Sequence, residues 1–241
     1  MAQVINTNVG SLFAGAALNK SANALQTAQQ RLSSGLRINS SKDDATGLGI
    51  ATTYDSQVRG TNIAVRNAND AISNAQTLDG YAAQVLENLQ RLNEIFVQTG
   101  DVTTVESVAL VAENGRIATL SATNALIGTS VTVDGEGGVV AASSAAIAAL
   151  TGATAALVLA DIATIVASRE EYGADMATFS SAVTTMQTAA VNMAASYSRI
   201  MDTDYAAETT AMTRNNILQQ AGTAVLAQAN QTPNTVLSLL R

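Results

Sequence analysis

Two pairs of adjacent carboxylates come nearest to a chemical site in this 241-residue chain. Asp43 and Asp44 form its only adjacent aspartate pair, and Glu170 and Glu171 form a second acidic pair. Paired carboxylates can act as general acid and base or bind a hard cation. The chain has no histidine and no cysteine, so it lacks the commonest general base, a thiol nucleophile and the usual ligands of zinc, haem and iron–sulfur clusters. We therefore expect no enzyme activity, no cofactor and no metal site.

The same residues are spaced to begin helices. Ser41 and Asp44 have the spacing of a capping box, and acidic side chains in a first helical turn favour the helix dipole. The pair at Glu170 fits a solvated first turn in the same way. The glycines of 47–49 and 135–138 lack the sequence context of a phosphate-binding loop. We expect them to be turns or points of close packing.

The net charge of −7 is unevenly distributed along the chain. Residues 1–42 contain four bases and no acid, and residues 209–241 contain two bases and no acid, so all nineteen carboxylates lie from Asp43 to Glu208. Binding to phosphates requires a concentrated basic face, which an acidic chain does not offer. We expect no nucleic-acid partner.

Stripes of apolar residues at alternating spacings of three and four predict long helices. One is expected through most of 44–100 and another from about Ala174 to Met201, with helices also at Val105–Leu126 and Ala145–Ala167. The predicted core of this helical region consists of Ile72, Leu89, Leu92, Phe96, Met176, Phe179, Val183, Met186, Met193, Tyr197 and Ile200.

The residues between the long stripes predict one short β-hairpin. β-Branched residues flank an Asp-Gly turn signal within 131–140, which places the hairpin near 129–140. The alanine-rich stretch 145–167 has the length of a membrane span, but it contains Asp161, and a charge at the centre of such a helix costs about 2.5–3.5 kcal/mol. We expect a packed helix there and no membrane insertion.

The two ends of the chain carry narrow apolar seams on helices that are lean in large side chains. Ordering such a segment costs more conformational entropy than its own few apolar residues offset, so each end needs a partner surface. We expect the ends to assemble through a seam that consists of Leu18, Leu25, Leu32, Leu218, Val225, Leu237 and Leu240.

Two long motifs give these ends a family resemblance. Residues 29–51, QQRLSSGLRINSSKDDATGLGIA, and 217–241, ILQQAGTAVLAQANQTPNTVLSLLR, resemble the N- and C-terminal signatures of bacterial flagellins. The resemblance covers about residues 1–100 and 165–241. It is close enough that the chain is identified as a short member of that family, without the outer variable domains.

The resemblance implies a mainly α fold, a long-helix bundle with one hairpin. The N- and C-terminal helices would pair as an axial coiled coil formed by residues 1–32 and 206–241. Residues 33–46 would be a linker, and residues 47–205 would form an outer helical domain. Acid-free ends can pack closely around a filament axis while the acidic middle faces water.

The function implied by the resemblance is that of an extracellular structural subunit, which polymerises into the flagellar filament for swimming motility. Its partners would be many copies of itself, the flagellar export apparatus, an export chaperone, the filament cap and hook-junction proteins. The first ten residues lack a basic region followed by an apolar core, so export without a cleaved signal peptide is expected. A hook–filament junction protein and a membrane-active amphipathic helical protein are the alternatives.

One helical segment suggests a further partner. Residues 89–98 are similar to the helix of many flagellins that animal Toll-like receptors recognise, with matches that include Leu89, Gln90, Arg91 and Glu94. The alternative is that Leu89 belongs to the core, while the three polar residues face neighbouring subunits. The sequence leaves receptor contact and subunit contact both open.

Overall fold

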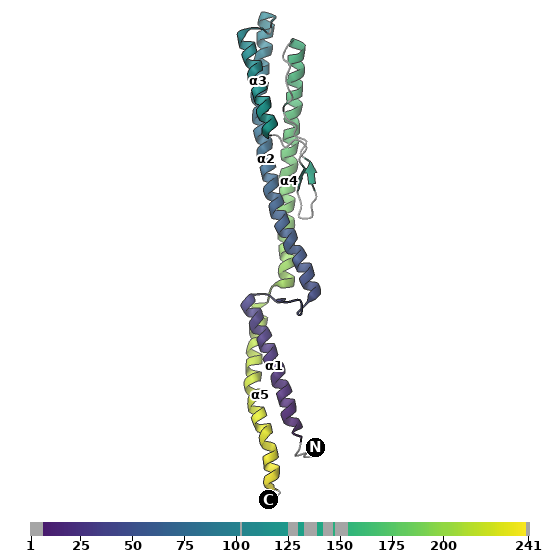
Figure 1. Ribbon diagram of the computed structural model, residues 1–241, viewed down its shortest axis with the longest axis vertical. Coiled ribbons are helices and arrows are strands. Elements are labelled where there is room, and N and C mark those ends of the chain that lie inside the picture. The colour runs from purple at the N-terminus through teal and green to yellow at the C-terminus, as the bar shows by residue number, and fades with distance from the viewer. Residues whose placement is uncertain are drawn as a thin grey trace. The chain divides into compact units, whose positions relative to one another are not determined.

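Five long helices make up most of the part of the chain that the structure describes (Figure 1). This computed structural model describes residues 7–101, 103–124, 130–132, 139–141, 147 and 154–239, with the backbone alone for 124, 130–132, 139–141 and 232–239. The helices are α1 Val9–Ser34, α2 Ala45–Thr99, α3 Val105–Asn124, α4 Ala155–Met201 and α5 Tyr205–Leu239.

Local side chains define both ends of α1. The Asn8 side chain accepts a hydrogen bond from the Ser11 amide at 3.1 Å, which satisfies one of the free N–H groups of the first turn. At the other end Gly35 has φ of +72°, and its amide donates to the Arg31 carbonyl at 2.8 Å. Glycine adopts this left-handed conformation without strain, so the helix stops here.

Asp44 caps α2, and the capping box expected from Ser41 is not what starts this helix. The Asp44 carboxylate accepts the Gly47 amide at 2.8 Å. A Cβ atom at Gly47 would lie 2.9 Å from the Ile38 side chain and closer still to Asp44, so glycine leaves room for the cap. The helix ends at Gly100, which has φ of +70°. The physical reason for the correction is that an aspartate at the N-cap satisfies the first-turn amides itself.

The expected hairpin is present, and α4 is longer than the stripe that predicted it. Strands β1 Ser130–Thr132 and β2 Val139–Ala141 pair antiparallel, with Val131 opposite Val140. The predicted turn between them lies outside the described residues. Helix α4 begins at Ala155 rather than near Ala174, because the alanine-rich segment continues into the heptad stripe without a break. The start of the helix expected at Ala145–Ala167 also falls largely outside the described residues.

The contacts divide the chain into two compact units. The terminal unit comprises residues 1–53 and 196–241, and the middle unit comprises residues 54–195. The terminal unit has seven basic and five acidic residues, a net charge of +2, whereas the middle unit has five basic and fourteen acidic residues, a net charge of −9. The boundaries 33–46 and 47–205 that we inferred for a filament subunit stay a prediction.

Helices α2, α3 and α4 share the main core of the middle unit. The Asp79 carboxylate and the Arg169 guanidinium join α2 to α4 at 2.7 Å at its edge. The fully buried tyrosine of this core, Tyr172, was not predicted. The core cluster consists of Leu78, Ala82, Val85, Leu89, Leu92, Ile117, Ile147, Val158, Ile165 and Tyr172.

A second cluster of the middle unit is built on small residues of α2. Ala64, Ala68 and Ala71 leave room for Phe179 and Met186 of α4, both of which are buried.

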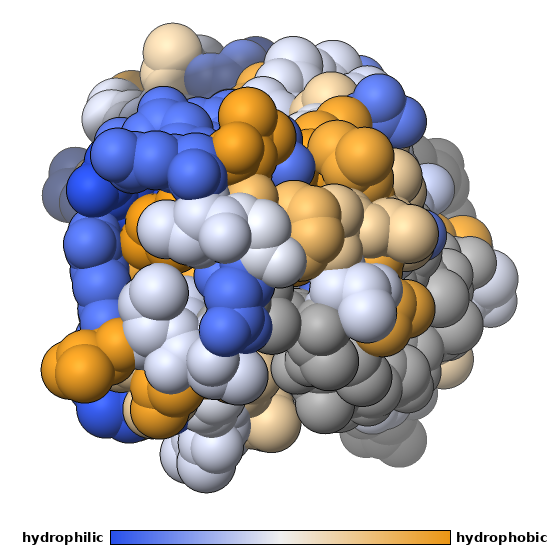
Figure 2. All heavy atoms as spheres, turned by 90° about the horizontal axis from the view of Figure 1, so that it is seen from above, coloured by the Kyte–Doolittle hydropathy of each residue, from blue (hydrophilic) through white to orange (hydrophobic). Residues whose placement is uncertain are grey.

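Figure 2 views the molecule from above, with hydrophobic residues between hydrophilic ones on that face.

The predicted core residues divide between these clusters and a third one. Leu89, Leu92, Phe179 and Met186 are buried, whereas Ile72, Phe96, Met176, Val183 and Met193 are half-buried. Beside Phe96 it is Ile95 that is buried. Tyr197 and Ile200 lie in the terminal unit instead, where they pack with Ile38, Ala51 and Met201.

Candidate assembly surface

Helices α1 and α5 pack against each other in antiparallel orientation along a narrow seam (Figure 1). Only Ala14, Ser21 and Ala28 of α1 are buried in the pair. Small side chains let two helix backbones approach closely, but they remove little apolar surface from water. The half-buried or buried positions recur at spacings of three and four, at Ser11, Ala14, Leu18, Ser21, Leu25, Ala28 and Leu32 of α1 and Glu208, Met212, Asn215, Gln219, Gly222, Leu226 and Ala229 of α5.

A glycine sets the closeness of the two helices in the middle of the seam. A Cβ atom at Gly222 would lie 3.2 Å from Cδ1 of Leu18. A side chain at position 222 would therefore make a tight contact with Leu18, and one of the two would have to shift.

Polar contacts fix the register of the pair near the start of α1. The Asn8 side-chain amide donates to the Ala229 carbonyl, and the Ser11 hydroxyl donates to the Asn230 side chain, both at 2.8 Å. These bonds join residues more than 200 positions apart in the chain. They are made only when the two ends of the chain lie together.

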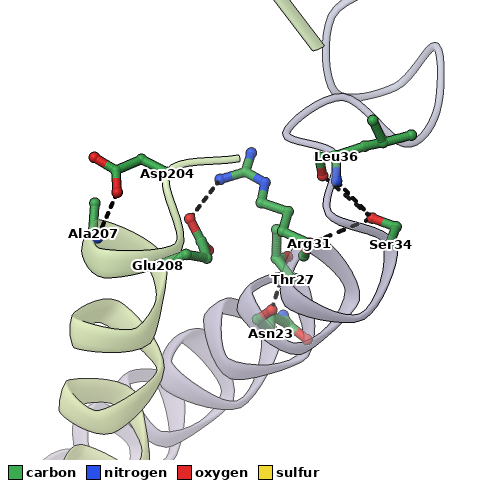
Figure 3. A network of polar contacts seen from close by, with 8 residues as sticks. All are labelled: Asn23, Thr27, Arg31, Ser34, Leu36, Asp204, Ala207 and Glu208. Atoms are coloured by element: carbon green, nitrogen blue, oxygen red, sulfur yellow. Dashed lines mark hydrogen bonds and ion pairs between the residues drawn. The ribbon is translucent and has the colours of Figure 1, made fainter. Parts of the chain in front are cut away.

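An ion pair holds the opposite end of the pair (Figure 3). The Arg31 guanidinium lies 3.6 Å from the Glu208 carboxylate, and both side chains are largely buried. Arg31 is in the last turn of α1 and Glu208 in the first turn of α5, so each charge also favours the dipole of its own helix. Asp204 caps α5 by accepting the amides of Ala206 and Ala207 at 3.0 and 3.2 Å.

The segment after α1 is paired with the segment after α4. Leu36 and Asp202 form an isolated antiparallel bridge, flanked by the hydrogen bond from the Arg37 amide to the Met201 carbonyl at 2.6 Å. The Arg37 guanidinium also donates to the carbonyl of Ile200 at 2.8 Å. Residues 36 and 37 of the predicted linker are therefore hydrogen-bonded to the end of α4 and to the segment that connects α4 to α5.

The carboxylates of Asp43 and Asp44 serve local structure, since both accept hydrogen bonds from neighbouring residues. The Asp43 carboxylate accepts the Ser40 hydroxyl at 3.1 Å and the amides of Asn39 and Ser40 at 3.2 and 3.0 Å. The Ser40 hydroxyl is the main cause that lowers the pKa of Asp43, and the two amides add to it. Hydrogen bonds that favour the charged form tie up this carboxylate within its own turn. In the described part of the chain, no three acidic residues gather where they could share a metal ion.

An apolar groove runs along one side of the α1·α5 pair. It has a volume of about 580 Å³, and charge enters its lining only through Lys20. Three large apolar side chains of the lining remain in water, since Phe13 is 78% exposed, Leu218 50% and Val225 55%. The rest of the lining is Gly10, Ala14, Ala17, Leu18, Ser21, Ala24, Asn215, Ala221 and Gly222.

The predicted assembly seam is thus split between two surfaces. Leu18, Leu25 and Leu32 are half-buried where α1 meets α5, and Leu18 also lines the groove. Leu218 and Val225 line the groove and are exposed. The side chain of Leu237 and the whole of Leu240 lie outside the described residues. A second set of half-buried positions on α5, Asn215, Gly222 and Ala229, repeats every seven residues and was not predicted, because its members are small or polar.

The segment proposed for receptor contact has one buried and three exposed members. Leu89 is fully buried, which agrees with its place in the predicted core, and its side chain packs in the cluster shared by α2, α3 and α4. Gln90 is exposed, and the Arg91 guanidinium binds Glu106 at 2.8 Å and Glu94 at 3.1 Å. Hydrogen bonds to Glu106 and Glu94 raise the pKa of Arg91, so the arginine stays charged.

None of the helices in the described ranges combines the length and the apolar character needed to cross a membrane.

Comparison with known proteins agrees with this arrangement. The family model of the bacterial flagellin N-terminal helical region matches residues 5–137, and that of the C-terminal helical region matches residues 156–240. Flagellin of Xenorhabdus nematophila is 38% identical over a 315-position alignment that covers all of both chains.

Longer relatives match only in part. Flagellin of Salmonella typhimurium strain LT2 is 53% identical, and flagellin of Escherichia coli K12 51% identical, over 107 residues. Each match covers 44% of this chain and 22% of the relative, so the alignment spans about a fifth of those flagellins. With both helical regions matched at the expected ends, the chain belongs to the bacterial flagellin family.

Proposed function

We propose that the chain is a structural subunit that polymerises into the bacterial flagellar filament and serves swimming motility. In this proposal the axial layer is formed by residues 1–32 and 206–241, the linker by 33–46 and the outer layer by 47–205. The protein acts outside the cell and without catalysis.

The exposed groove on the α1·α5 pair is the observation that carries the proposal. A single molecule leaves Phe13, Leu218 and Val225 in contact with water. Burying one such side chain stabilises an assembly by about 1.5–3 kcal/mol. Lys20 is the one charged residue of the groove lining, so contact between copies at the groove brings few charges together. Contacts that repeat head to tail between different surfaces generate an open helical polymer.

Seeded growth of the purified protein tests the groove. Val225→Asp places a carboxylate in the groove and is expected to stop elongation from short filament seeds, as seen by electron microscopy. The matched control is Ala109→Asp, an exposed position of α3 in the already acidic middle unit, which should elongate like the parent. Equal growth of Val225→Asp and parent, at equal helicity, would contradict the proposal.

The position of the protein along the native flagellum, seen by antibody labelling in electron microscopy, distinguishes a filament subunit from a hook–filament junction protein. A filament subunit must be present along the whole filament. Labelling confined to the base of the filament would contradict the proposed role and favour a hook–filament junction protein.

The proposed partners in export and capping follow from family membership. They are the flagellar export apparatus, an export chaperone, the filament cap and hook-junction proteins. Recognition by an animal Toll-like receptor would rest on Gln90, Arg91 and Glu94, the exposed members of the segment on α2. Arg91→Ala should then reduce binding of the monomer to the receptor, and unchanged binding would contradict that contact.

A further inference from the structure

The surface of α1 divides into three stripes, of which the contact with α5 uses one and the groove uses another. Each member of the third stripe precedes a position of the α5 contact by two residues, which places it about 200° around the helix from that contact. All members of this stripe are exposed, and none is charged. We call it the outer stripe, and it consists of Val9, Leu12, Ala16, Asn19 and Asn23.

The outer stripe begins with two large apolar side chains in water. Val9 is 66% exposed and Leu12 is 65% exposed. They lie about one helical turn apart, and Ala16 continues the same line by another turn. An apolar line with this spacing is the kind of surface that a helix lays into the hydrophobic groove of a partner.

The groove on the α1·α5 pair needs a surface unlike itself if the polymer is to grow. Two grooves that face each other would form a closed two-fold pair, whereas an open polymer requires two different surfaces on each copy. Groove-to-groove contact would also bring together the Lys20 side chains of both copies, which repel each other. The proposed filament therefore requires a second surface that fits the groove.

The outward face of α5 is the other candidate for this second surface, and its chemistry suits the groove less. Ile217 is 61% exposed, but the polar residues Thr213 and Gln220 lie about one turn to either side of it. Arg214 lines the same hollow as Ile217, so docking by this face would bring a second cation toward Lys20. The outer stripe of α1 offers two large apolar residues and brings no charge.

We propose that the outer stripe of α1 docks into the groove of a second copy of the chain. Val9, Leu12 and Ala16 are the i, i+3 and i+7 positions of this contact. The groove, at about 580 Å³, is in the size range of pockets that enclose a small ligand, so it has room for several side chains of a helix. The inference rests on the proposed function, because it names the partner surface of the same groove.

Cross-linking between two single-cysteine variants tests the contact in filaments of the full chain. The chain lacks cysteine, so Leu12→Cys and Val225→Cys each carry one thiol, and a bifunctional maleimide can join only different copies. Filaments grown from an equal mixture should give roughly ten times more linked heterodimer than a mixture of Ile217→Cys and Val225→Cys, because proximity raises the effective concentration of the second thiol. Ala16→Cys replaces Leu12→Cys if that variant does not polymerise. Equal yields from the two mixtures would overturn the proposal.

Growth from seeds separates a failure of this inference from a failure of the proposed function. Leu12→Asp and Val225→Asp damage opposite sides of one contact, so neither should elongate seeds alone, at a helicity equal to that of the parent. Parent-like growth of Val225→Asp would contradict the proposed function. Parent-like growth of Leu12→Asp, with Val225→Asp still blocked, would overturn this inference alone.

Mixtures of each aspartate variant with the parent sharpen the same test. One of the two variants keeps intact the surface that meets the seed, so it adds once and blocks the next copy. A small fraction of that variant should stop growth of the parent, whereas the same fraction of the other should have little effect. Equal inhibition by the two variants would contradict a contact between unlike surfaces.

Discussion

The α1·α5 pair and the three-helix core of the middle unit are both built from long helices, yet they bury different kinds of side chains. The pair buries Ala14, Ser21 and Ala28 of α1, whereas the middle unit fully buries Leu89, Tyr172 and other large residues. Because the hydrophobic effect scales with apolar area, the two regions should differ in stability by several kcal/mol. The difference suggests that the middle unit folds within one molecule and the terminal pair depends on neighbouring copies.

Amide exchange of the free monomer should show the largest contrast. Helices α1 and α5 are expected to exchange orders of magnitude faster than the α2 core around Leu89, because local opening costs little where few apolar contacts are lost. In the assembled state both regions should exchange slowly, which mass spectrometry after deuterium labelling can follow. Slow exchange throughout α1 in the monomer would remove the distinction between the two regions.

Truncation of a large side chain should separate folding from assembly. Leu89→Ala is expected to lower the free energy of unfolding of the middle unit by about 2–5 kcal/mol, since it opens a cavity in a packed core. Val225→Ala should change the monomer by less than about 0.5 kcal/mol, because its side chain is half in water. Chemical denaturation followed by circular dichroism measures both. A loss of monomer stability at position 225 as large as that at 89 would contradict the comparison.

Two glycines offer a smaller and closely matched test. A Cβ atom at Gly80 of α2 meets nothing within 4 Å, so Gly80→Ala should stabilise the helix by about 1 kcal/mol. At Gly222 of α5 the added methyl group would lie 3.2 Å from Cδ1 of Leu18, which is a tight contact. We expect Gly222→Ala to gain less than Gly80→Ala in thermal unfolding, and to weaken assembly as measured by the critical concentration. An equal gain at both sites would show that the α1·α5 seam is looser than described.

Extremes of pH should act on the two units separately. Hydrogen bonds lower the pKa of Asp43, so its contribution is present above the ordinary aspartate pKa of about 3.9 and is lost as pH falls through the lowered value. Burial, and to a lesser degree Glu171 and Asp79, raises the pKa of Tyr172. The middle unit should therefore lose stability as pH rises above about 10, the ordinary tyrosine value.

Titration by nuclear magnetic resonance checks the acid side of this prediction. Ser40→Ala removes the main hydrogen bond to Asp43 and should move its pKa back up toward the ordinary value. An unchanged Asp43 titration in Ser40→Ala would show that the amides alone hold the carboxylate.

Thermal unfolding at alkaline pH checks the other side. Tyr172→Phe should remove part of the alkaline sensitivity of the middle unit, with Tyr197→Phe as the half-buried control.

Apolar periodicity predicted the helices, and β-branched residues around an Asp-Gly turn signal predicted the hairpin. The resemblance of the terminal motifs to flagellins implied that the two ends pair. Leu18, Leu25 and Leu32 lie near the partner helix because a heptad places them on one face whatever the partner is. Asp44 and Gly35 end their neighbouring helices through bonds within a few residues. Such local features depend on the order of residues alone.

Choices between neighbouring faces depended on the tertiary structure. On α5, two sets of positions repeat every seven residues: Leu218 with Val225, and Asn215 with Gly222 and Ala229. The glycine faces Leu18 of α1, where an added Cβ atom would lie 3.2 Å from Cδ1 of that leucine. On α3, the buried Asn114 accepts a hydrogen bond from Asn88 of α2, a partner that lies 26 positions away in the chain. The sequence by itself determined where helices form and which ends pair. The tertiary structure decided which face each helix buries, because that choice depends on the space and the polar atoms that a distant segment provides.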